Sequence, residues 1–245
     1  MKTIQRTNML IAAGAVALGL TVATASAASA TDTTTIASPS TTLRVRDLSA
    51  ERTRCEAAID ARLAELTKID TTLGAATHVS DAHKATQTTN NTAAASGLST
   101  LRTKIAADTD QATLAADCKS IFETYRVFAL RAPQTHLVIA GDVESYAVTK
   151  LDGVVPKLTD AIAKAQAAGK DVSGANAALA DMQAKLADAA SQANGLADSV
   201  IGYVPADYNA NHALLSGARG KARAAATDLK AARVDVKTIE ADLKA

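Results

Sequence analysis

Aromatic residues, proline and cysteine are scarce in this 245-residue chain, and tryptophan is absent. Aromatics make up 2% of the residues, and there are 4 prolines, 12 glycines and 2 cysteines. Strand-rich folds depend on aromatic and β-branched side chains, so a β-sandwich or a β-barrel is disfavoured. In contrast, 58 residues are alanine, close to a quarter of the chain, and alanine has the highest helix propensity. The composition therefore predicts an all-α fold.

The apolar run at residues 9–20 is shorter than the about 20 residues needed to span a membrane. Lys2 and Arg6 precede it, and Ala-Ser-Ala follows twice, ending at Ala27 and at Ala30. This pattern is typical of a secretory signal peptide cleaved after one of these two alanines. We therefore expect residues 1–30 to be removed. The mature chain would be secreted and extracellular, either released or held at the cell wall, without insertion into a membrane.

Neither sign of charge predominates. The chain has 26 basic and 25 acidic residues, and loss of Lys2 and Arg6 leaves 24 basic against 25 acidic ones. A near-neutral chain with interleaved signs offers no electrostatic attraction for nucleic acid. It also lacks the polybasic face that binds anionic membranes. The partner expected from the sequence is a protein or another component of the cell envelope, and the oligomeric state stays open.

Residues 31–45 are rich in threonine and serine and have no helical period. Such a segment buries little apolar surface, so we expect a flexible linker. Helical periodicity then extends over residues 46–245, which are expected to form the folded part.

Cys55 and Cys118 are the only cysteines. An even number in an exported protein predicts one disulfide, because a metal pair lacks further ligands at suitable spacing and a free thiol does not persist after export. Closing a loop of this size stabilises the fold by about 4 kcal/mol in the chain-entropy model. The chain between the two cysteines must therefore go out and return.

Apolar residues recur at steps of three and four, the period of amphipathic helices. We expect a bend or fraying at the polar run 87–92, a helix end or kink at Pro133, and a further kink at Gly153 and Pro156. Short turns between long helices predict an elongated antiparallel bundle resembling a coiled coil. It could divide into two three-helix units, 46–133 and 134–245. The expected helices span residues 48–73, 81–108, 109–132, 142–168, 179–200 and 208–243.

The segment 118–146 is unusual because it holds four of the six aromatic residues. One interpretation is an aromatic plug that closes the core beside the disulfide. The other is a partner-binding site with Tyr125, Arg126, Arg131 and His136 as anchors, because tyrosine and arginine are enriched among residues that dominate binding energy. An ion pair of Arg126 with Asp142 or Glu144 is also expected.

The sequence YRVF…P…HLVIA within this segment resembles a group of uncharacterised exported helical proteins from actinobacteria. The resemblance covers most of residues 48–170 and includes the positions of Cys55 and Cys118. It implies an exported, helical protein with one cysteine pair, and it implies no catalytic or binding residue.

No catalytic signature is present: GxSxG, HExxH, a phosphate-binding P-loop and a dinucleotide-binding GxGxxG are all missing. His78 and His83 are five residues apart, a spacing that does not place two metal ligands on one helical face. No metal or cofactor is predicted. The favoured function is a non-catalytic structural or protein-interaction role. The alternatives are a lipid- or membrane-surface binder and, less favoured, an extracellular hydrolase using His136 with Asp142.

Overall fold

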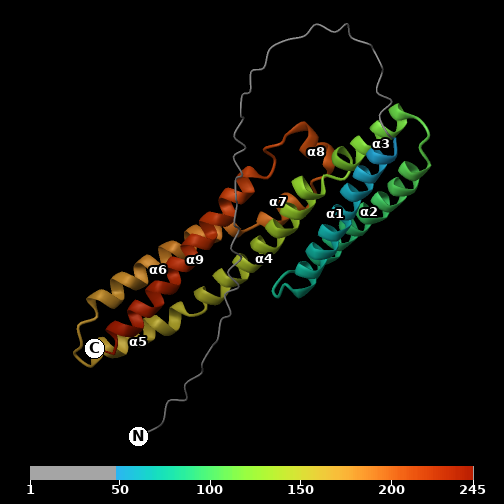
Figure 1. The fold of residues 1–245 in the computed structure, drawn as a ribbon. Helices are drawn as coiled ribbons and strands as arrows, with labels where there is room; N and C mark the ends of the chain where they lie inside the picture. Colours follow the sequence, from blue (N-terminus) through green and yellow to red (C-terminus); the bar gives the residue numbers. More distant parts are fainter. Residues whose placement is uncertain (1–47, 245) are drawn as a thin grey trace, which may run out of the picture. The chain divides into compact units, whose positions relative to one another are not determined.

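The residues from Leu48 to Lys244 are described by a computed structural model, and they form helices with no strand among them (Figure 1). The predicted all-α helical bundle is thus confirmed. The expected signal peptide at 1–30 and linker at 31–45 lie outside the described residues. The helical segments are α1 (Leu48–Ala75), α2 (Asp81–Ala107), α3 (Gln111–Glu123), the π-helical turn η1 (Val127–Arg131), α4 (Ala132–Asp152), α5 (Val155–Ala167), α6 (Ser173–Ala193), α7 (Leu196–Ile201), α8 (Pro205–Ala210) and α9 (Ser216–Asp242).

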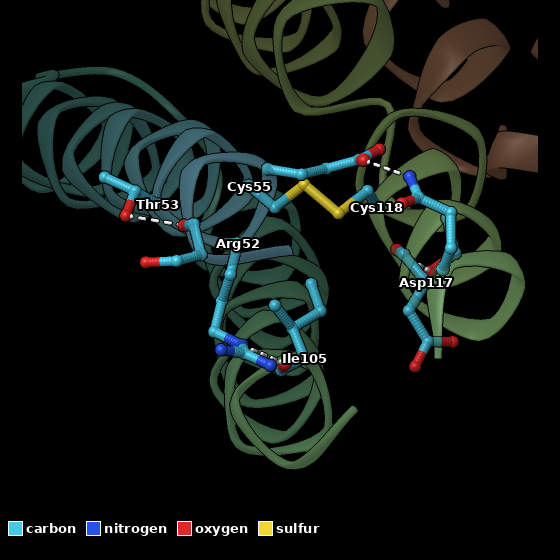
Figure 2. The surroundings of a disulfide bond; sticks show 10 residues. Arg52, Thr53, Cys55, Ile105, Asp117 and Cys118 are labelled. Atoms are coloured by element: carbon cyan, nitrogen blue, oxygen red, sulfur yellow. Dashed lines mark hydrogen bonds between the residues drawn. A yellow bond between two sulfur atoms is a disulfide. The ribbon is translucent and has the colours of Figure 1, made fainter. Parts of the chain in front are cut away.

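The first three helices go out and back, as the cysteine spacing requires. Ser80 and Asp110 cap α2 and α3, because their side-chain oxygens accept hydrogen bonds from backbone N–H groups of the first turns. Between the helices lies a core of isoleucine and leucine side chains. The disulfide between Cys55 and Cys118 joins α1 to α3, with 5.5 Å between the two Cα atoms (Figure 2). The predicted pairing is confirmed.

Beside the disulfide, Arg52 ties α1 to the end of α2. Its Nε donates to the carbonyl oxygen of Ile105 at 3.1 Å (Figure 2). Its Nη2 donates to the carbonyl oxygen of Asp108 at 2.6 Å. The Ile105 carbonyl also accepts from the backbone N–H of Asp108 at 3.4 Å, so the guanidinium adds to the hydrogen bonding of carbonyls at the end of α2, where helical partners are few.

The expected bend at residues 87–92 is wrong, because α2 continues without interruption through this polar run. Gln87 and Asn91 are buried and find partners on other helices. The Gln87 amide oxygen accepts from Thr135 Oγ1 of α4 at 3.1 Å, and Asn91 Nδ2 donates to Asp70 Oδ1 of α1 at 2.7 Å. Polar side chains that compete with the helix in isolation therefore serve here as contacts between helices.

The helix expected up to Pro133 ends ten residues earlier, at Glu123. Arg126 then adopts a left-handed conformation, with φ 43° and ψ 38°, and the wide turn η1 leads directly into α4. Pro133 occupies the first turn of α4 instead of a helix end. This position suits proline, because the first turn of a helix leaves its N–H groups unpaired.

In the second half of the chain, the expected kink at Gly153 and Pro156 separates α4 from α5. The helix expected over 179–200 is interrupted at Asn194 and Gly195, where Gly195 has φ 68°. The last helix begins at Ser216 and not near 208, because Pro205 starts the short helix α8.

Helices α6 and α9 lie side by side, as Figure 1 shows, and bury alanines against each other. Leu130, Leu137, Val138 and Leu215 belong to a further cluster, in which α4 packs on α7 and the start of α9. Helix α4 also contacts α1, so it is shared between the early and the late helices. The division into units 46–133 and 134–245 stays a prediction.

Candidate functional site

The four residues expected as partner anchors lie around the break between α3 and α4, but in different environments. Tyr125 is half-buried against α2, and Arg126 is half-buried toward α8. Arg131 is only 8% exposed, whereas His136 is exposed on α4. The structure therefore brings Tyr125 and Arg131 to one place and leaves His136 apart.

Arg126 does not pair with Asp142 or Glu144, so that expectation is wrong. Its Nε donates to Asn209 Oδ1 of α8 at 2.5 Å, and Asn209 Nδ2 donates to the carbonyl oxygen of Glu123 at 3.0 Å. The Arg126 guanidinium also lies over the Tyr208 ring, 5.5 Å from its centroid. The last turn of α3 is thus joined to α8, 86 residues further along the chain.

Tyr125 packs against α2 at a glycine. A Cβ at Gly97 would lie 2.6 Å from a ring carbon of Tyr125 and 2.7 Å from its hydroxyl oxygen, so only glycine leaves room for the ring at this place. Burial raises the pKa of the Tyr125 hydroxyl above 10.0, which keeps the group a protonated hydrogen-bond donor.

Beside Tyr125 is a pocket of about 200 Å³. Its walls come from α2, the α3–η1 break and the first residue of α8, and they consist of Asn90, Ala93, Ala94, Thr124, Tyr125, Arg131 and Pro205. Two of the four expected anchors therefore line one cavity.

The guanidinium of Arg131 has few partners for a buried charge. Its Nη1 donates to Gln134 Oε1 at 3.3 Å, and its Nε is buried without a partner. Among the described residues no carboxylate lies within 4.0 Å of it. Burial lowers the pKa of Arg131 below 12.5.

Gln134, the hydrogen-bond partner of Arg131, also contacts α7. Its Nε2 lies 2.6 Å from the carbonyl oxygen of Val200, 3.2 Å from that of Ile201 and 3.0 Å from that of Tyr203. The amide thus satisfies the carbonyls at the end of α7 and holds the start of α4 against it.

The aromatic-plug interpretation is wrong for the phenylalanines. Phe122 is 47% exposed and Phe128 is 51% exposed. Arg62 of α1 lies between them, with its Cζ 4.3 Å from the centroid of Phe122 and 5.3 Å from that of Phe128. We call Arg62, Phe122 and Phe128 the phenylalanine surface.

The Arg62 guanidinium at this surface is mostly buried, and burial lowers its pKa below 12.5. Its Nη1 donates to the carbonyl oxygen of Ala58 at 2.8 Å, whereas its Nε is buried without a partner. Among the described residues it has no carboxylate within 4.0 Å. The two ring faces are its main neighbours.

A second polar cluster that the sequence did not indicate joins three helices. His83 Nδ1 of α2 lies 2.8 Å from Asp142 Oδ2 of α4, and His83 Nε2 lies 3.0 Å from Asp198 Oδ1 of α7. Partial burial acts to lower the pKa of His83, but the hydrogen bonds and charges of the two aspartates outweigh it, so the pKa is raised above 6.5. The charged ring can donate to both carboxylates at once.

This cluster also bears on the alternative of a hydrolase. Asp142, the expected partner of His136, binds His83 and the backbone N–H of Ser80 at 2.9 Å instead. Tyr146, the last aromatic residue of the segment 118–146, stacks on His78 with 3.5 Å between the ring centroids. It therefore does not contribute to an aromatic plug beside the disulfide. Among the described residues, Asp142 thus pairs with His83 and Ser80 rather than with His136.

Glu144 lies on α4 between the buried positions Gly141 and Val148. One of its carboxyl oxygens is buried without a hydrogen-bond partner, and burial raises the pKa of Glu144 from 4.5 to about 7. The carboxyl group is therefore partly protonated near neutral pH.

No protein-family model, curated protein or solved structure matches the chain. Within residues 48–244, no helix has the length and apolarity required to cross a membrane. No group of three or more histidine, cysteine or acidic side chains in the same range is arranged to hold a metal ion.

Proposed function

We propose that this chain is a non-catalytic, exported helical protein that binds a partner protein at the phenylalanine surface. The observation that carries the proposal is the exposure of both phenylalanines of the chain, at 47% and 51%, around one arginine. In a chain so poor in aromatic residues, these two would stabilise the core most if they were buried.

The phenylalanine surface has the composition of an interface centre. Arginine and aromatic side chains dominate binding energy in many complexes. The rings are also held in place, since Phe122 belongs to α3, Phe128 to η1 and Arg62 to α1, three elements that share one core. Because little ordering is required, such a surface can bind with a small loss of conformational entropy.

The chemistry of the partner follows from what the surface leaves unsatisfied. Arg62 has no carboxylate partner among the described residues, and the rings offer apolar area on either side. A complementary segment would present an aspartate or glutamate flanked by apolar side chains. The partner is therefore expected to be an acidic, partly apolar protein segment.

The place of action follows from sequence arguments. Basic residues, a short apolar run and two Ala-Ser-Ala patterns favour export, and the disulfide is compatible with an oxidising compartment. The resemblance of the YRVF…P…HLVIA segment to exported actinobacterial helical proteins would imply the same location. In this proposal the mature chain acts outside the cell, released or at the cell wall.

A capture experiment from the cell-envelope fraction tests the proposal. The purified protein is compared with the double variant Phe122→Ala, Phe128→Ala. The matched control is Val204→Ala, Val234→Ala, which removes two exposed apolar side chains elsewhere. We expect a protein that is retained by the wild type and the valine control and reduced at least about tenfold by the phenylalanine variant. Equal retention by all three would contradict the proposal.

A vesicle co-sedimentation experiment separates a protein partner from a lipid surface. Vesicles with and without anionic lipid are mixed with the same three proteins. We expect no sedimentation above background for any of them. Strong sedimentation of the wild type that is lost in the phenylalanine variant would assign the surface to lipid and overturn the protein-partner proposal.

A further inference from the structure

The pocket beside Tyr125 is separate from the phenylalanine surface and contains unused hydrogen-bonding groups. Asn90, Thr124 and Tyr125 line it, and none of their side chains hydrogen-bonds to another described residue. Their amide and hydroxyl groups can donate as well as accept. A pocket whose polar groups are not engaged by other side chains is suited to a polar ligand.

Arg131 adds a full positive charge to this wall. The side chain is 8% exposed, its Nε has no partner, and its single hydrogen bond to the neutral amide of Gln134 is 3.3 Å long. An unpaired buried charge is strongly unfavourable, and such charges are normally paired with an opposite charge. No described residue supplies that charge, so the guanidinium is free to pair with an anionic ligand.

We propose that this pocket binds a small molecule with a carboxylate group, with Arg131 as the charge partner. The planar guanidinium presents parallel N–H donors that match the two oxygens of a carboxylate. Ala93, Ala94 and Pro205 form an apolar wall for a short carbon chain, and the Tyr125 hydroxyl donates a further hydrogen bond.

The size of the pocket limits the ligand further. Its volume of about 200 Å³ is below the range of about 300–1,000 Å³ in which drug-sized ligands bind. The ligand is therefore a carboxylate with a body of only a few carbon atoms. The pocket wall and the phenylalanine surface share no residue, so the two sites can serve different ligands.

An NMR titration with sodium butanoate tests the inference directly on the purified protein. The Nε–H signal of Arg131, identified by its loss in Arg131→Gln, reports on the guanidinium, and the backbone amide of Gly97 reports on Tyr125. We expect saturable shifts of both signals with butanoate. Equimolar sodium chloride and 1-butanol, which lack the carboxylate, should leave them unshifted.

Three variants locate the binding. Arg131→Gln should weaken butanoate at least about tenfold, because it removes a charge-assisted bidentate contact. Arg131→Lys keeps the charge but loses the planar fork, and Tyr125→Phe loses only the hydroxyl, so both should weaken binding by less. Arg54→Gln is the matched control, because it removes the same charge from an exposed arginine of α1 outside the pocket wall.

Several outcomes would overturn the inference. These are no saturable shift in the wild type, equal binding by Arg131→Gln and the wild type, or equal binding of 1-butanol. Tighter binding of inorganic phosphate than of butanoate would overturn the carboxylate assignment. If Arg131→Gln does not fold, weaker butanoate binding by Tyr125→Phe and the absence of shifts with chloride or 1-butanol still test whether the pocket binds a carboxylate. A variant that no longer binds butanoate should still retain the partner protein at the phenylalanine surface. The failure of one proposal can therefore be distinguished from the failure of the other.

Discussion

Helices α1–α3 and the pair α6 and α9 achieve stability by different means. In α1–α3, isoleucine and leucine side chains fill the core, and a disulfide links the first helix to the third. In α6 and α9, alanines occupy several of the buried positions and no covalent link is present. Large aliphatic side chains bury more apolar area each, whereas alanine lets two helices approach closely along their length.

The difference matters because the groups proposed to bind ligands lie on the disulfide-linked side. Arg62 and Phe122 belong to α1 and α3, and the pocket draws residues from α2. A mostly buried, unpaired guanidinium and half-exposed rings lower the stability of this region. The disulfide beside them offsets that cost, and the alanine-lined pair needs no such support.

The largest expected effect comes from removing the covalent link. The double variant Cys55→Ser, Cys118→Ser should lower the free energy of unfolding by about 4 kcal/mol, because the unfolded chain regains the entropy that the closed loop removes. Urea denaturation followed by circular dichroism measures it, and the wild type with reductant should show the same loss. A loss below about 1 kcal/mol would mean that the aliphatic core alone holds α1–α3.

A smaller effect is expected where α4 and α7 approach each other through a glycine. A Cβ at Gly141 would lie 2.8 Å from the backbone nitrogen of Ala197, which cannot rotate away. Gly141→Ala should therefore destabilise the protein by about 1–3 kcal/mol, measured by urea denaturation. The matched control is Gly217→Ala in α9, where nothing lies within 4 Å of the added atom. This control should raise stability by up to about 1 kcal/mol through helix propensity. Equal effects at both positions would argue against close packing of α4 on α7.

The smallest expected effect concerns the buried face of α4 and depends on pH. The pKa of Glu144 is raised from 4.5 to about 7 in the folded protein, so the folded state binds more protons than the unfolded state between these values. Stability is therefore greatest below pH 4.5 with respect to this group, and it falls as the pH rises toward 7. Glu144→Gln should remove this loss and stabilise the protein at pH 8 by about 1–2 kcal/mol, a value reduced for partial solvent contact.

Unfolding free energies at pH 5 and pH 8 measure this effect. Glu240→Gln, at an exposed position of α9, is the control and should leave the pH dependence unchanged. The pKa of His83 is also raised in the folded protein. The stabilisation that His83 provides is therefore present below pH 6.5 and is lost as the pH rises through the pKa of the folded state. The Glu144 variant should thus retain part of the pH dependence. An unchanged slope would contradict the burial of Glu144.

The sequence was sufficient for features that depend on local pattern or chain constraint. Periodicity and composition predict the all-α bundle, the cysteine count predicts the disulfide, and Gly153 with Pro156 predicts a kink at the place where α4 and α5 are separated. The break at Asn194 and Gly195 could have been predicted too, because Asn-Gly is a typical turn pair.

Features that depend on distant partners were not predictable in the same way. Gln87 and Asn91 weaken a helix considered alone, but they are buried against Thr135 and Asp70. The break before η1 has no glycine or proline, and Arg126 is held there by Asn209, 83 residues away. Arg62 between two phenylalanines, and His83 between two aspartates, likewise require contacts that only the folded chain provides.

The disulfide has a consequence for cleavage of the backbone. The turns at 76–80 and 108–110 both lie inside the loop closed by Cys55 and Cys118. A protease that cuts either turn once releases no fragment, because the sulfur–sulfur bond still joins the two pieces. The phenylalanine surface would then keep its components from α1 and α3 on one covalently connected molecule after a single nick.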